Sequence, residues 1–132
     1  MKKMLAILTM VLLSAGAFAQ TKPMDWAELK AYHSVMSATF HPAEEGKLEP
    51  IKSRSGEMVE KAVALQKSTP PADFDKKEIK KQVNKLVKGS KDVDKLVKKN
   101  AADADITKGL TSLHDVFHEI VGLCSGEHED HK

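Results

Sequence analysis

The sequence has few of the residues that build disulfide-linked or aromatic-rich proteins. Its 132 residues include one cysteine and one arginine, and aromatic residues make up 5%. The single cysteine, Cys124, excludes an internal disulfide, which leaves three roles for it: a buried thiol, a metal ligand or an intermolecular bridge. No aromatic residues lie among the lysines of residues 76–99. A nucleic-acid groove needs such stacking residues, so we expect no nucleic-acid partner.

Catalytic signatures are also missing. The chain has no glycine-rich phosphate loop. The spacing of its residues indicates no Ser-His-Asp or Cys-His arrangement and no general acid-base pair. We therefore do not expect an enzyme.

The one hydrophobic run of any length lies at the N-terminus. Lys2 and Lys3 precede an apolar run over residues 4–13, and small residues follow up to Ala17-Phe18-Ala19. This pattern is typical of a cleaved signal peptide, here residues 1–19. The run is too short for a lasting membrane anchor, and Gln20 stands where a lipid-anchored protein has cysteine. We expect a periplasmic protein with no stable membrane anchor after cleavage.

The net charge of +2 belongs to the segment that export removes. Of 21 basic side chains, two are Lys2 and Lys3, and the remaining 19 equal the 19 acidic ones. The charge is nevertheless unevenly placed, because residues 76–99 carry a net +7 and residues 103–132 a net −5. Two interpretations stay open: the lysine-rich segment complements its acidic neighbours, or it docks an acidic redox partner protein.

Four segments carry apolar residues at alternating steps of three and four, the spacing that places them on one stripe of a helix. The expected core stripes are Trp26-Leu29-His33-Met36-Phe40, Ile51-Ser55-Met58-Ala62-Leu65, Ile79-Val83-Leu86-Ser90-Val93-Val97 and Ile106-Leu110-Leu113-Phe117-Ile120-Cys124. They predict an all-α, up-down-up-down antiparallel four-helix bundle over residues 20–126, followed by a polar tail of histidines and acids over residues 127–132.

Proline and polar residues mark the expected helix ends. Asp25 is a plausible cap for the first helix, which should end at His41-Pro42 because the residue before proline is disfavoured in a helix. Pro50 should open the second helix, Pro70-Pro71 should follow it, and Asn100 should separate the third from the fourth.

The histidines are the residues best suited to chemistry. His114 and His118 are four residues apart, so they point the same way from one helix and can share a metal ion. Pairing the ends of the antiparallel first and last helices places His33 level with about Val116, between those two. We therefore expect a copper or zinc site made of His33, His114 and His118. Further candidate ligands are His41, Met58 and Cys124.

The end of the second helix adds a resemblance. The run Ala62-Val63-Ala64-Leu65-Gln66-Lys67-Ser68-Thr69-Pro70-Pro71, within a bundle that follows a signal peptide, resembles the soluble periplasmic cytochromes of the b five-six-two family. That family holds haem b without a covalent link, between a ligand early in the first helix and a histidine late in the last. The late histidine corresponds to His118. The early ligand, usually methionine in the family, falls at Tyr32 or His33, and of these only His33 is a plausible axial ligand.

Three functions thus stay open. The resemblance implies an electron carrier with haem b held by His33 and His118, in a pocket of Leu29, Met36, Met58 and Phe117. The spacing of the histidines alone predicts a haem-free copper or zinc protein. The third interpretation is a structural or interaction bundle with no cofactor.

Overall fold

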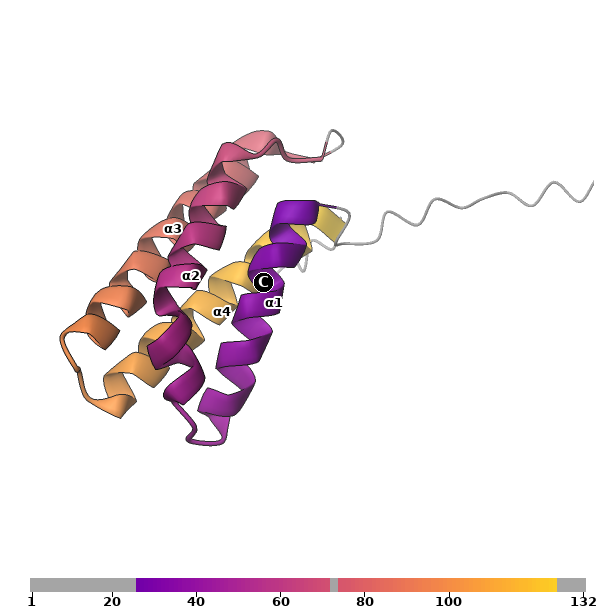
Figure 1. Cartoon of the computed structure of the whole chain (residues 1–132). Helices are drawn as coiled ribbons and strands as arrows, with labels where there is room; N and C mark the ends of the chain where they lie inside the picture. The colour runs from indigo at the N-terminus through magenta and orange to yellow at the C-terminus, as the bar shows by residue number, and fades with distance from the viewer. Residues whose placement is uncertain (1–25, 72–73, 126–132) are drawn as a thin grey trace, which may run out of the picture.

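The computed structural model describes residues 26–71 and 74–125, which form four helices (Figure 1). They are α1 (Ala27–Glu44), α2 (Glu49–Lys67), α3 (Lys76–Lys98) and α4 (Asp103–Ser125). Successive helices run in opposite directions, so the start of α1 and the end of α4 lie at the same end of the bundle. The predicted up-down-up-down four-helix bundle is confirmed. The predicted signal peptide, residues 1–19, and the predicted tail, residues 127–132, lie outside the described residues.

The core follows the predicted stripes, except that Val97 of α3 is only partly buried and that α1 needs a correction. Every predicted stripe residue of α2 and α4 is buried. In α1, however, His33 is exposed and Tyr32 is buried in its place. The prediction that His33 lies in the core stripe is therefore wrong. The tyrosine ring fills the core instead, because its hydroxyl finds a buried partner, the Ser90 hydroxyl, 3.0 Å away.

α1 is longer than its proline predicts. Pro42 lies inside the last turn and the helix continues to Glu44, so the prediction of an end at His41-Pro42 is wrong. Beyond it the chain turns at Gly46, whose φ of +81° suits glycine. The amides of residues 45–47 donate hydrogen bonds to the carbonyls of Pro42 and Ala43. This cap satisfies the last carbonyls and holds the helix together past its proline.

The other helix ends agree with the predictions that the described residues can test. Pro50 lies in the first turn of α2, and the chain leaves the helix at Ser68, just before Pro70-Pro71. Asn100 has a positive φ of 51° between α3 and α4. The predicted cap residue Asp25 lies outside the described residues, and the N-cap position of α1 is Trp26.

The helices form a ring whose most open seam is that between α1 and α4. Neighbours α1 and α2, α2 and α3, and α3 and α4 pack along most of their length, whereas α1 and α4 approach each other over a shorter stretch. The α3–α4 seam is especially close, since a Cβ atom added at Gly89 would lie 2.8 Å from Cδ1 of Leu113. The shorter contact between α1 and α4 leaves room for a pocket between the first and last helices.

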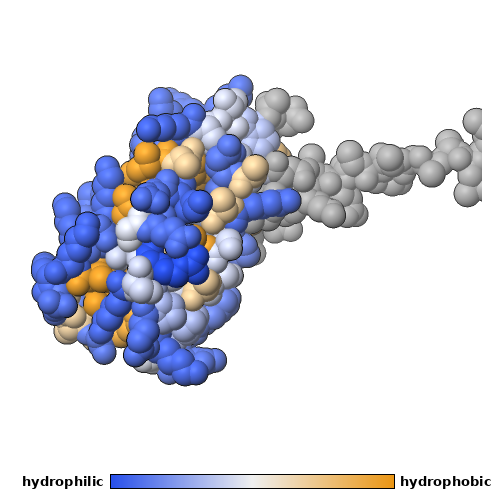
Figure 2. Space-filling view, in the orientation of Figure 1, coloured by the Kyte–Doolittle hydropathy of each residue, from blue (hydrophilic) through white to orange (hydrophobic). Residues whose placement is uncertain are grey.

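The surface is polar and its positive charge gathers on α3. Figure 2 shows hydrophilic side chains over most of one face, with smaller hydrophobic patches between them. All ten lysines of residues 76–99 are exposed. Their ion pairs, such as that between Lys88 and Asp92 at 2.8 Å, lie within α3, and no ion pair of the described residues joins α3 to α4. None of the four described helices is long and apolar enough to cross a membrane.

Candidate metal site between the first and last helices

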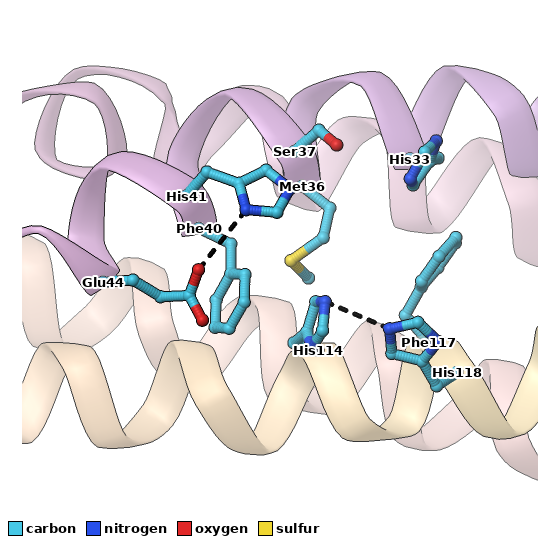
Figure 3. Close-up of a pocket in the computed structure, with 9 residues that line it drawn as sticks. All are labelled: His33, Met36, Ser37, Phe40, His41, Glu44, His114, Phe117 and His118. Carbon is cyan, nitrogen blue, oxygen red and sulfur yellow. Dashed lines mark hydrogen bonds and ion pairs between the residues drawn. The ribbon is translucent and has the colours of Figure 1, made fainter.

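A pocket of about 300 Å³ opens between α1 and α4. Figure 3 shows the side chains of the two helices facing each other across it. The residues that line it are His33, Met36, Ser37, Phe40, His41, Glu44, His114, Phe117 and His118. The fold thus brings all four histidines that we predicted as ligands to the same pocket.

The closest pair of donor atoms in this pocket belongs to α4. Nε2 of His114 and Nε2 of His118 are 3.1 Å apart, and their rings are nearly perpendicular at 79°. Two imidazole nitrogens that bind one ion at about 2.0–2.1 Å lie about 2.9 Å apart at a right angle and about 3.3 Å apart at the tetrahedral angle. The observed distance falls between these values. The pair therefore has the separation of a two-nitrogen metal clamp, and without a metal one ring donates a hydrogen bond to the other.

Aromatic rings hold two of the histidines in place. Phe40 of α1 lies flat against His114, with ring centroids 3.9 Å apart and an interplanar angle of 10°. Phe117 lies flat against His33 at 5.2 Å and 9°. Spacing places both phenylalanines in the core but cannot show how their rings face, so the contact between Phe40 and His114 was not predicted.

The surroundings of His114 favour its neutral form. Its side chain is half-buried, whereas His118 is exposed. Burial lowers the pKa of His114, and the charge of protonated His118 lowers it further. Because only a neutral imidazole binds a metal, a lowered pKa keeps His114 ready to act as a ligand.

His33 lies at the predicted height but outside the pair. Its stacking on Phe117 agrees with the expectation that it is level with residues between His114 and His118. Its side chain is exposed, and among the described residues no group of three His, Cys, Asp or Glu side chains is placed to share one ion. A three-histidine site would need His33 to turn from the Phe117 ring toward the α4 pair.

The longer α1 places a carboxylate beside His41. Nδ1 of His41 and Oε2 of Glu44 are 3.3 Å apart, and both side chains are well exposed at the rim of the pocket. A carboxylate that accepts from one ring nitrogen orients the other nitrogen for a ligand. His41 therefore lies at the rim of the pocket, paired with Glu44 and not with the α4 histidines.

The other predicted ligands do not reach the pocket. Met58 and Cys124 are both buried, but neither lines the space between α1 and α4. Burial raises the pKa of the Cys124 thiol, which disfavours the thiolate that a metal needs. Of the four residues predicted to surround haem, Met36 and Phe117 line the pocket, whereas Leu29 and Met58 lie elsewhere in the core.

Haem b does not fit these residues as they are arranged. Two axial histidines must direct a nitrogen at the iron from opposite sides of the porphyrin. Instead, His33 lies against Phe117, and Nε2 of His118 is directed at His114. The pocket volume of about 300 Å³ is also at the lower limit for drug-sized ligands, most of which are smaller than haem.

Comparisons with known proteins do not extend this description: no family model, no curated protein and no solved structure matches the chain. The resemblance to the b-type cytochromes rests on the sequence pattern alone and stays a prediction. The class defined by fold and site is a four-helix bundle with a histidine-lined pocket between its first and last helices.

Proposed function

We propose that this protein is an exported four-helix bundle that binds one transition-metal ion, copper or zinc, between α1 and α4. The observation that carries the proposal is the 3.1 Å separation of the His114 and His118 Nε2 atoms, which face each other within a pocket. Imidazole is a good ligand for both metals, and two histidines at this helical spacing bind one ion from the same side.

The position of the site favours a carrier over a metal-stabilised fold. In the described part of the chain, every buried side-chain nitrogen and oxygen has a hydrogen-bond partner. The apolar core is continuous through all four helices. The bundle is therefore complete without an ion. A site at the surface of a core that is already fully packed can bind and release its metal without unfolding the protein.

Titration of the exported chain with Zn(II) and with Cu(II) tests the proposal. We expect binding of one ion in the pocket, and a loss of affinity of at least about tenfold in His114→Ala and in His118→Ala. For comparison, His41→Ala removes the histidine at the rim and should lower either affinity less than His114→Ala or His118→Ala does. Equal affinities in all four proteins would contradict the proposal.

The haem prediction is checked by a visible spectrum. Protein produced with haem available should show no Soret band if the pocket holds a bare ion. A Soret band that disappears in His118→Ala would instead favour the haem protein that the sequence resemblance implies.

A further inference from the structure

We infer that the ion carried by this pocket is Cu(I), with the Met36 thioether as the ligand that joins α1 to His114 and His118 of α4. The inference rests on the proposed function, since it names the metal for the same histidine pair. It adds the Met36 thioether as a ligand from the opposite helix, and it assigns the oxidation state Cu(I).

Met36 is the soft donor in this pocket. Its side chain is only 1% exposed, yet it forms part of the pocket lining. Figure 3 shows it running from α1 into the pocket with its sulfur directed toward His114. A ligand set of two imidazoles from one helix and one thioether from the other would therefore span the open seam of the bundle.

The remaining lining residues leave the thioether as the best third ligand. The rings of Phe40 and Phe117 cannot coordinate, and the carboxylate of Glu44 is exposed at the rim beside His41. The described residues contain no group of three His, Cys, Asp or Glu side chains suited to one ion. With His33 stacked on Phe117 and His41 paired with Glu44, Met36 is the donor of α1 that can join the α4 pair without either contact being broken.

This donor set discriminates between metals. Zinc sites use thiolate, imidazole and carboxylate ligands and are almost always four-coordinate, with water in the fourth position when it stays open. Thioether sulfur is a soft ligand that selects Cu(I), which accepts low coordination numbers. The two phenylalanine rings place apolar surface directly beside His33 and His114, and apolar surface suits a singly charged ion better than a doubly charged one.

The experiment compares two methionines of the same chain. The full exported protein is titrated with Cu(I) without oxygen, in competition with a chromogenic Cu(I) chelator, and separately with Zn(II). Met36→Leu is compared with Met58→Leu, which changes a methionine that is buried away from the pocket. Both exchanges nearly conserve volume, so both variants should fold, as circular dichroism can verify.

We expect Met36→Leu to lower the Cu(I) affinity at least about tenfold, with Zn(II) affinity unchanged, and Met58→Leu to change neither. Methyl-detected NMR of methionine gives a second readout, since diamagnetic Cu(I) should shift the Met36 methyl signal and leave that of Met58 in place.

The possible failures are distinguishable. If Met36→Leu binds Cu(I) as well as the unchanged protein while His114→Ala does not, the thioether inference is overturned and the proposed function stands. If Met36→Leu loses Zn(II) and Cu(I) to the same degree, Met36 acts through packing and the inference is likewise overturned. If His114→Ala and His118→Ala keep both affinities, the proposed function itself fails.

Discussion

The hydroxyls of Tyr32 and Ser90, 3.0 Å apart, join α1 to α3 across the core of the bundle. These helices lie diagonally opposite, and no close backbone contact links them among the described residues. Ser90 uses its own hydrogen in a 2.7 Å bond to the carbonyl of Leu86, so the tyrosine must be the donor to Ser90. This chain of two bonds satisfies both buried hydroxyls and sets the height of α1 relative to α3.

Because Tyr32 is the donor, removing its hydroxyl and removing the Ser90 hydroxyl should cost different amounts of stability. In Tyr32→Phe, Ser90 keeps its bond to Leu86, and we expect the free energy of unfolding to fall by only about 1 kcal/mol. In Ser90→Ala, the tyrosine hydroxyl is left buried without a partner, at a cost of about 1–3 kcal/mol. Urea denaturation of the two variants and of the double variant measures the difference. A larger loss in Tyr32→Phe than in Ser90→Ala would contradict the assigned direction.

Two helical glycines should respond oppositely to alanine. Gly56 in α2 is exposed, and a Cβ atom there would meet nothing within 4 Å. Gly56→Ala should therefore raise the free energy of unfolding by about 0.5–1 kcal/mol, because alanine favours the helix. A Cβ atom at Gly89 would lie 2.8 Å from Leu113, whose side chain is buried. Gly89→Ala should lower stability, since overpacking costs about 1–3 kcal/mol. Thermal unfolding of both variants measures the signs, and equal stabilisation would show that Leu113 moves freely.

His114 should make the stability of the metal-free bundle depend on pH. Its pKa in the folded state is lowered, first by burial, from the ordinary value of 6.5. As the pH falls below 6.5, the unfolded chain takes up a proton at this ring that the folded state resists, so the free energy of unfolding falls. Urea denaturation between about pH 7.5 and pH 5.5 should therefore show a steeper loss in the unchanged protein than in His114→Gln. Parallel curves for the two proteins would contradict the expectation.

Phe40 should control the titration of His114. Its ring covers the imidazole at a centroid distance of 3.9 Å, so Phe40→Leu removes part of the burial that lowers the pKa. We expect the pKa of His114 to rise toward 6.5 in this variant, as measured by NMR titration of the imidazole signals. Phe74→Leu, which changes a phenylalanine away from the pocket, is the control and should leave that pKa unchanged.

Features that depend on spacing within one helix could be predicted from the sequence, whereas features that depend on contacts between helices could not. The stripes of α2 and α4 follow from spacing, and the pairing of His114 with His118 follows from their separation by one helical turn. Spacing does not show which of Tyr32 and His33 is buried, because the two are adjacent. The residue that decides it, Ser90, lies on another helix. The end of α1 was missed for a similar reason, since the amides that cap it come from the following loop.

The same limit explains what was missed at the site. Pairing the helix ends placed His33 at nearly the correct height, opposite Phe117. The rotation of α1 about its own axis determines which of its residues face α4. It leaves His33 exposed to solvent and turns Met36 and Phe40 toward α4. That rotation is set by the packing of all four helices together, which the spacing within one helix does not contain.

The open seam between α1 and α4 is also where the two ends of the described chain meet. An ion held by Met36 on one side and by His114 and His118 on the other would tie the first helix to the last and close most of the polypeptide into a loop. A long-range disulfide stabilises a fold by restricting the unfolded chain, whereas such a clasp would stabilise it by binding the folded state alone. A chain with a single cysteine cannot form that bond within itself, so the metal would supply a reversible cross-link whose strength follows the metal supply.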